Sequence, residues 1–260
     1  MLGISGEVRG FQDIGTRDEM KAVQLHGVNA NGAHIMAVLS GHGDDGKVIA
    51  ESGALSVVEA IGTEYPEYSD AMSIAQDIGA MLARLSLEIE DEDAIETDYY
   101  FSGAAATVAV AYAGKVALAW MGHARAYYVA NDYAALLLTK PHDRTNDKEF
   151  ERAHGKGGRL VNPWTADMRW TSDFVGGQTL TITRAIGDIG FDFVDHEPEF
   201  KEESLIVPGR LVIGSSGFWG RGEDPDIFDR LREGSVDETY VQRLARQHEN
   251  NAAVIIAPIG

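Results

Sequence analysis

Residues 38–46, "VLSGHGDDG", place side chains that could bind metal or phosphate directly after an apolar run. The run "HIMAVLS" predicts a buried strand, and the glycine-rich turn after it carries His42, Asp44 and Asp45. A metal site at such a strand end needs a carboxylate, because Mg²⁺ and Mn²⁺ prefer anionic oxygen ligands. The residue at the tip of the strand is Ser40. The turn is therefore either a metal site or the remains of one.

The elements that position this turn follow from alternation and residue type. Alternating and β-branched residues predict strands at 33–40, 105–111, 115–121, 125–130, 135–139, 179–183, 209–214 and 252–258. Helical spacing of apolar residues predicts helices at 46–64, 68–91, 224–234 and 236–250. Hairpin strands with helices in separate pairs favour an α+β fold of antiparallel sheets covered by helices. We expect a single domain over residues 1–260.

Composition narrows the classes of function. The chain has 260 residues and a net charge of −19, which disfavours nucleic acids and anionic membranes as partners. It has no cysteine, which excludes disulfides, thiolate metal sites and a cysteine nucleophile. The N-terminus shows no signal-peptide pattern, and Gly114 and Lys115 interrupt the most apolar stretch. We expect a cytoplasmic globular protein without a membrane or nucleic-acid partner.

Nine segments, spread over nearly the whole chain, form an ordered set of motifs. They are "GTRDEM", "SGHGDDG", "SGAAATVAV", "MGHARAYYV", "LLTKPHDR" with "EFERAHGKGGRL", "LTITRAIGD", "HEPEF", "GSSGFWG" and "ENNAAVII". In this order they resemble the motifs of the metal-dependent type 2C (PPM-type) protein Ser/Thr phosphatases. The resemblance implies a β-sandwich of two antiparallel sheets flanked by helix pairs, with the active site in a cleft at one end.

The resemblance implies a site for two metal ions, but this chain lacks several of the carboxylates that would hold them. Two Mg²⁺ or Mn²⁺ ions, held by carboxylates and a glycine carbonyl, activate a water that attacks phosphoserine or phosphothreonine. Gly41 keeps the position of the glycine carbonyl. The positions that match the family's carboxylates are Ser40, Ser216 and Asn250, with His123 at a further metal and Lys21 and Ala22 after the N-terminal arginine.

The loss of these charges decides between two interpretations. One unit-charge pair at roughly 4 Å and an effective dielectric of ~20 is worth ~4 kcal/mol, so losing three carboxylates removes most of the affinity for two dications. Ser40, Gly41, Ser216 and Asn250 therefore form a degenerate metal site without a cofactor, and the chain is predicted to be a catalytically inactive phosphatase homologue.

Two alternatives remain open. In the first, the chain is an active phosphatase dependent on Mn²⁺ or Mg²⁺, with a metal site rebuilt from Asp44, Asp45 or Glu249. In the second, the cleft is vestigial and the function lies on an outer helix face.

The retained residues indicate anion binding. Arg17 matches the family's phosphate-binding arginine, and His42 matches the histidine proposed to protonate the leaving group. With Lys21 and His123 they predict a cationic pocket for phosphate or another anion. The resemblance implies a phosphorylated protein, a kinase or a phosphatase as the partner of a scaffolding or regulatory protein.

Two further predictions concern structure rather than chemistry. Arg184 and Asp188 lie four residues apart, a spacing that permits an ion pair. Phe218 and Trp219 follow a glycine-rich turn and are expected in the core.

Overall fold

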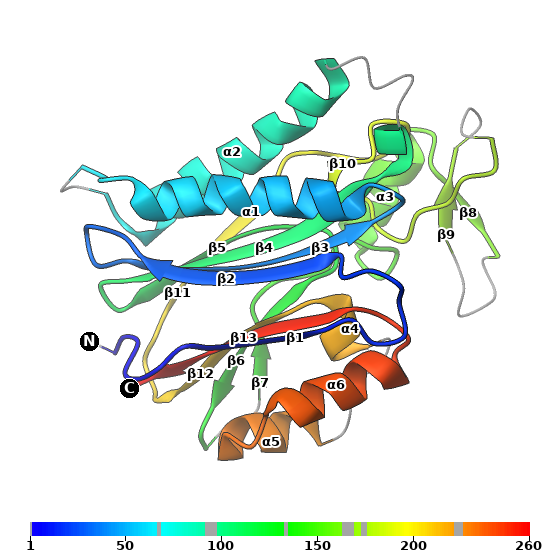
Figure 1. Ribbon diagram of the computed structural model, residues 1–260. Helices are drawn as coiled ribbons and strands as arrows, with labels where there is room; N and C mark the ends of the chain where they lie inside the picture. Colours follow the sequence, from blue (N-terminus) through cyan, green and yellow to red (C-terminus); the bar gives the residue numbers. More distant parts are fainter. Residues whose placement is uncertain are drawn as a thin grey trace.

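The computed structural model describes residues 2–66, 69–91, 98–132, 135–162, 169–172, 176–220 and 226–260. Two sheets of antiparallel strands stack face to face, and helices cover their outer faces (Figure 1). This arrangement confirms the predicted α+β class and the sandwich of the PPM-type phosphatases.

The strands divide between the two sheets as follows. One sheet contains β1 (Arg9–Asp13), β13 (Ala252–Ile259), β12 (Gly209–Gly214), β6 (Arg125–Ala130) and β7 (Ala135–Leu137), in that spatial order. The other contains β11 (Glu199–Ser204), β5 (Lys115–Met121), β4 (Gly103–Tyr112), β3 (His34–His42) and β2 (Ala22–Val28), with β10 (Ile186–Gly187) also paired to β4. β8 (Arg159–Val161) and β9 (Arg169–Thr171) form a separate small sheet.

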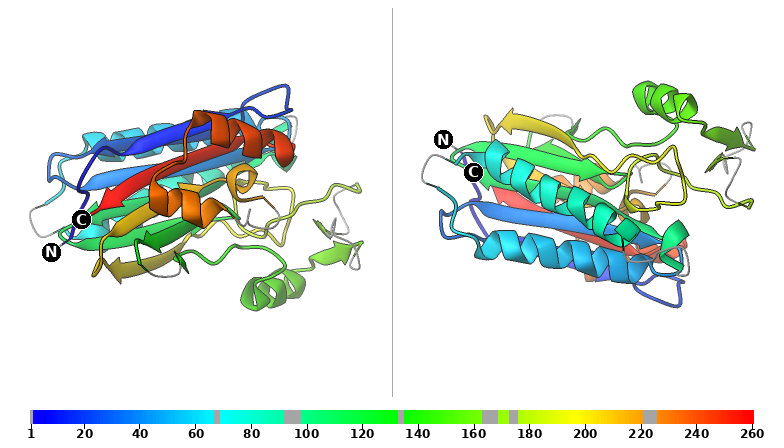
Figure 2. Two further views of the ribbon diagram at one scale, coloured as in Figure 1. Left: turned by 90° about the horizontal axis from the view of Figure 1, so that it is seen from below. Right: turned by 90° about the horizontal axis from the view of Figure 1, so that it is seen from above.

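The helices lie on the outside of each sheet (Figures 1 and 2). α1 (Gly46–Gly62) and α2 (Ala71–Asp91) pack on the sheet that contains β3 and β4. α4 (Ser216–Trp219), α5 (Ile227–Glu233) and α6 (Glu238–Gln247) cover the other sheet. α3 (Asp147–Gly155) and the β8–β9 sheet project beyond the end of the sandwich where β3 ends, and a short 3₁₀ helix, η2 (Asp98–Phe101), precedes β4. No helix among the described residues is long and apolar enough to cross a membrane.

Alternation along β3 shows how the sequence builds two core layers. Ile35 and Leu39 pack with the helices α1 and α2, whereas Met36 and Val38 pack between the sheets. Because successive side chains of a strand point to opposite faces, one fully buried strand supplies both layers. Phe218 and Trp219 are buried under α5 and α6, as expected.

The predicted elements match the structure where they are long and apolar. β5, β6 and β12 have the predicted bounds. The predicted strand at 179–183 is wrong, since only isolated bridges occur there, between Leu180 and Trp170 and between Ile182 and Asp143. The sequence patterns did not predict β1, β2 and α3, whose exposed faces carry many polar residues.

Candidate functional site

The turn after β3 and the residues that match the family's metal positions lie at one end of the sandwich. Ser40 is paired in the sheet with Ala22 of β2. The backbone of Lys21 links two motifs, because its carbonyl oxygen accepts from the Gly41 N–H at 2.7 Å and its N–H donates to Asn251 Oδ1 at 2.6 Å. The end of β3 is therefore linked through Lys21 to Asn251, the residue that precedes β13.

The other two positions that match the family's metal ligands meet beside Asn251. Ser216 begins α4, and Asn250 follows α6. Asn250 Nδ2 donates to Ser216 Oγ at 3.4 Å. The loop after β1 closes over this point, because a Cβ atom at Gly15 would lie 2.5 Å from the Asn250 carbonyl oxygen. Ser216 and Asn250 therefore meet directly, and Lys21 and Asn251 link this pair to the Ser40–Gly41 segment.

A lysine side chain occupies the turn itself. Lys21 Nζ donates to the carbonyl oxygens of Gly43 and Asp44, at 2.6 and 3.2 Å. The Asp44 side chain is exposed, and the Asp45 N–H donates to Ser102 Oγ at 3.0 Å. The ammonium group therefore supplies a positive charge to the carbonyls of the turn "SGHGDDG".

His42 is held by a buried carboxylate. Its Nε2 lies 2.5 Å from Asp188 Oδ2, and Asp188 is fully buried in the left-handed region at φ +57°. Gly103, opposite His42 in the sheet, has to be glycine, since a Cβ atom there would lie 2.4 Å from Asp188 Oδ2. The predicted ion pair between Arg184 and Asp188 is therefore wrong: the strand β10 separates the two residues, and Asp188 turns toward His42.

The other two cationic candidates differ in their surroundings. His123 follows β5, and its Nδ1 is buried without a hydrogen-bond partner in the described part of the chain. Burial and the neighbouring His42 lower the pKa of His123 to about 4, against the opposing effect of Asp143. Its imidazole is therefore neutral at pH 7. Arg17 is exposed on the loop after β1, and its guanidinium pairs with none of the described side chains.

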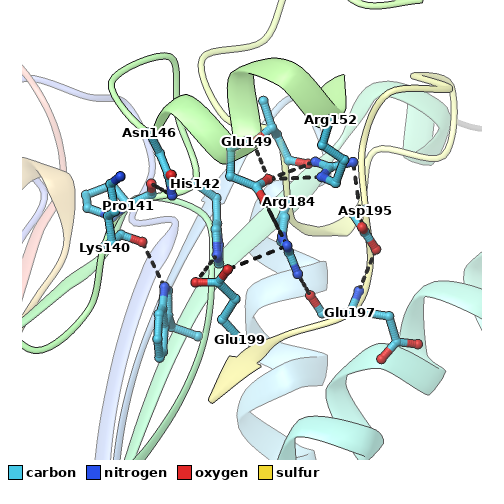
Figure 3. Close-up of polar contacts among 12 residues, drawn as sticks. Lys140, Pro141, His142, Asn146, Glu149, Arg152, Arg184, Asp195, Glu197 and Glu199 are labelled. Carbon is cyan, nitrogen blue, oxygen red and sulfur yellow. Dashed lines mark hydrogen bonds and ion pairs between the residues drawn. The ribbon is translucent and has the colours of Figure 1, made fainter. Parts of the chain in front are cut away.

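A second polar cluster, which sequence reasoning missed, centres on Glu149 of α3 (Figure 3). Arg184 donates to Glu149 Oε1 at 3.0 and 2.7 Å, and Arg152 donates to Oε2 at 3.2 and 2.9 Å. Thr183 Oγ1 also donates to Oε2 at 2.9 Å. Burial raises the pKa of Glu149, but the hydrogen bonds and charges of Arg184 and Arg152 outweigh burial and lower the pKa to about 2.

The same cluster contains one possible ligand set for a metal. Within the described ranges, the group of three His, Asp or Glu side chains close enough to share an ion is His142, Glu149 and Glu199, whose ligand atoms lie within 4.8 Å of one another. His142 Nδ1 accepts from the Gly122 N–H at 3.2 Å, so its proton is on Nε2, which faces Glu199 Oε2 at 3.3 Å. With both Glu149 oxygens already bound to guanidinium groups, these side chains complete an ion-pair network rather than an open metal site.

The carboxylates of the alternative, rebuilt metal site are Asp44, Asp45 and Glu249. Asp44, Asp45 and Glu249 form no such group with other described residues. Glu249 is exposed in a left-handed turn after α6, at φ +51°. The structure therefore does not assemble these three carboxylates into one ligand set.

The same sandwich occurs in several solved structures. A sex-determining protein of C. elegans is similar over 98% of this chain and 65% of its own, with 20% identity and a TM-score of 0.77. The serine/threonine phosphatase Stp1 of Staphylococcus aureus is similar over 99% and 96%, with 17% identity and a TM-score of 0.70. The catalytic domain of the phosphatase PstP, in complex with two manganese ions, is similar over 100% and 99%, with 16% identity and a TM-score of 0.67. At these identities the likeness establishes the fold, and this chain spans 65% of the length of the first of these proteins.

A match to a family model assigns the chain to a protein family. The model of protein phosphatase 2C matches residues 67–255. The chain therefore belongs to the protein phosphatase 2C family, as its motifs led us to expect. A search of curated proteins finds no match to the sequence.

Proposed function

We propose that this chain is a pseudophosphatase of the 2C family, which binds an anionic segment of a protein partner without hydrolysing it. The observation that carries the proposal is the position of the Lys21 ammonium group on the carbonyls of Gly43 and Asp44. A positive charge from the chain itself thus lies on the turn that follows Ser40 and Gly41, the positions where the family's chemistry requires metal cations.

The ligand set does not fit two divalent ions. Ser40, Ser216 and Asn250 offer hydroxyl and amide oxygens without charge, whereas Mg²⁺ and Mn²⁺ prefer carboxylates. An ammonium group on this turn also repels a dication bound nearby, which adds to the effect of the missing carboxylates. Without an ion to lower the pKa of a bound water, hydroxide is scarce at pH 7.

The same end of the molecule retains groups that bind anions. Arg17 is exposed, and its planar guanidinium matches two oxygens of a phosphate or carboxylate group. His42 is partly exposed and is oriented by Asp188. His123, being neutral, contributes a hydrogen bond rather than a charge. These groups favour a phosphoserine, a phosphothreonine or an acidic segment, and hence a phosphorylated protein, a kinase or a phosphatase as the partner.

The alternative function is an active phosphatase dependent on Mn²⁺ or Mg²⁺. What supports it is membership of the family, together with the two manganese ions of the PstP structure. Calorimetric titration of Mn²⁺ into the protein, with hydrolysis of a phosphopeptide followed in the same samples, separates the two functions. We expect no heat of binding at millimolar Mn²⁺ and no release of phosphate. Two sites of micromolar affinity, accompanied by turnover, would establish the alternative.

A further inference from the structure

Two histidines face each other on the hairpin β2–β3, far from the turn that contains His42. In the sheet, His26 lies opposite Met36, and His34 lies opposite Val28. The two histidines are therefore diagonal neighbours on one face of the sheet. His26 Nε2 lies 3.4 Å from His34 Nδ1, and the rings are nearly parallel, with an interplanar angle of 11°.

The backbone of this hairpin is firmly held. The Asn29 side chain is buried, and its Oδ1 accepts from the N–H groups of Asn31 and Ala33, at 3.1 and 2.9 Å. Asn31 exchanges two hydrogen bonds with the backbone of Tyr65, at 2.9 and 3.0 Å. These contacts fix the positions of both Cβ atoms, so that only rotation of the imidazole rings is left to adjust.

The surroundings leave the pair open to solvent and to small ligands. His26 is exposed, and His34 is half-buried at the edge of a pocket of about 200 Å³ between the two sheets. Lys115 also lines this pocket, but its Nζ is paired with Glu202 Oε1 at 2.5 Å. The positive charge of Lys115 is thus neutralised by Glu202, which lowers its repulsion of a metal cation.

The separation of the two nitrogens matches that of two ligands on one ion. Two imidazole nitrogens bound at ~2.05 Å to a tetrahedral ion lie about 3.3 Å apart. Metal binding also requires neutral imidazoles. Burial lowers the pKa of both histidines, and the proximity of His34 lowers that of His26 further. In the structure the two nitrogens share one hydrogen bond, and the tautomers with the proton on the other nitrogen of each ring present two lone pairs to one ion.

We propose that His26 and His34 form a two-histidine site for a divalent transition-metal ion of the Zn²⁺, Ni²⁺ or Cu²⁺ class. Imidazole nitrogen suits these ions, whereas Mg²⁺ and Mn²⁺ prefer oxygen ligands. Water fills the remaining coordination positions. The site lies at the opposite end of β3 from Ser40 and is independent of the family's metals, so neither proposal depends on the other.

The test is calorimetric titration of Ni²⁺ and Zn²⁺ into the untagged protein, compared with the variants His26→Gln and His34→Gln. We expect one site per chain, and at least a tenfold loss of affinity in each variant. The matched control is His154→Gln, an exposed histidine on α3, which should bind as the wild type does. An ion at 100 times its dissociation constant should raise the melting temperature by about 5–10 °C.

A second measurement needs no variant. Substoichiometric Cu²⁺ should broaden the NMR signals of His26 and His34 before those of His42 or His154, and the broadening should disappear as the imidazoles become protonated in acid. Equal affinity in the wild type and both glutamine variants, or no binding at millimolar Ni²⁺ and Zn²⁺, would overturn the proposal. Binding of Mn²⁺ near Ser40 would bear on the proposed function and not on this site.

Discussion

The Glu149 network and the end of the sandwich around Lys21 are both built from segments that match family motifs, but they differ in what they hold. In the network, the acidic residues Glu149 and Glu199 are present and paired with Arg152, Arg184 and His142. Around Lys21, the positions expected to be acidic carry hydroxyl, amide and ammonium groups. The buried ion pairs of this fold therefore lie at other positions than the carboxylates that metal binding needs.

The largest effect is expected from breaking the network. Arg184→Leu removes the partner of Glu149 Oε1 and leaves a buried carboxylate only half paired. The loss of one partner from a buried ion pair costs about 3–5 kcal/mol, which urea denaturation can measure. Arg84→Leu, at an exposed position on α2, is the matched control and should change stability by less than ~0.5 kcal/mol. Similar stabilities for the two variants would show that the network contributes little.

Acid should weaken the network in a defined window. The pKa of Glu149 falls from its ordinary value of 4.5 to about 2 in the fold. The contribution of ionised Glu149 to the free energy of unfolding is therefore fully present above pH 4.5 and is lost as the pH falls toward 2. That contribution is roughly 3 kcal/mol. The stability difference between wild type and Glu149→Gln, measured by denaturation at several pH values, should be constant above pH 5 and shrink below pH 4.5. A difference that does not change with pH would contradict the ionised state of Glu149.

At the other end of the molecule, restored charge should restore metal binding. The combined variant Ser40→Asp, Ser216→Asp and Asn250→Asp returns three carboxylates to positions that the backbone of Lys21 and Asn251 links. Mn²⁺ at 100 times its dissociation constant should then stabilise this variant by about 2.7 kcal/mol, seen as a shift in melting temperature. Each single variant should show little shift, since the ions share their ligands. Strong binding by the wild type or by any one single variant would refute the argument from lost charge.

The smallest effect concerns anion binding at Arg17. Arg17→Ala should weaken phosphopeptide binding by about 1.5–3 kcal/mol, the range for hydrogen bonds to charged groups. Binding should also weaken as salt is added, because exposed charges are screened. Calorimetry on wild type, Arg17→Ala and Arg84→Ala measures both effects. If Arg17→Ala binds as Arg84→Ala does, the partner uses another surface, such as an outer helix face.

The sequence predicts some parts of this structure better than others. Long apolar strands such as β5 and β12 were predicted with their bounds, because burial on both faces leaves a continuous apolar run. The edge strand β2 was not predicted, since Gln24 and His26 interrupt its apolar pattern. Convergence of Ser216 with Asn250 was expected from the resemblance alone.

The partners of charged residues were the least predictable. Glu149 lies 35 residues from Arg184 in the sequence, so no local spacing indicates the pair. The expected pairing of Arg184 with Asp188 assumed helical geometry, whereas Asp188 adopts a left-handed conformation after β10. Likewise, the contact of the Lys21 ammonium with backbone carbonyls leaves no signal in the sequence, because any residue type supplies a carbonyl.

The Lys21 ammonium group differs from a metal ion in that it cannot leave the turn it contacts. A metal ion in equilibrium with solvent leaves its site when its concentration falls or when a chelator removes it. Lys21 directly precedes the strand β2 in the chain, so its ammonium group cannot be diluted or chelated away from the carbonyls of Gly43 and Asp44. If the proposed function holds, we expect the shape of this end of the protein not to depend on the supply of divalent ions, so a chelator such as EDTA should leave it unchanged.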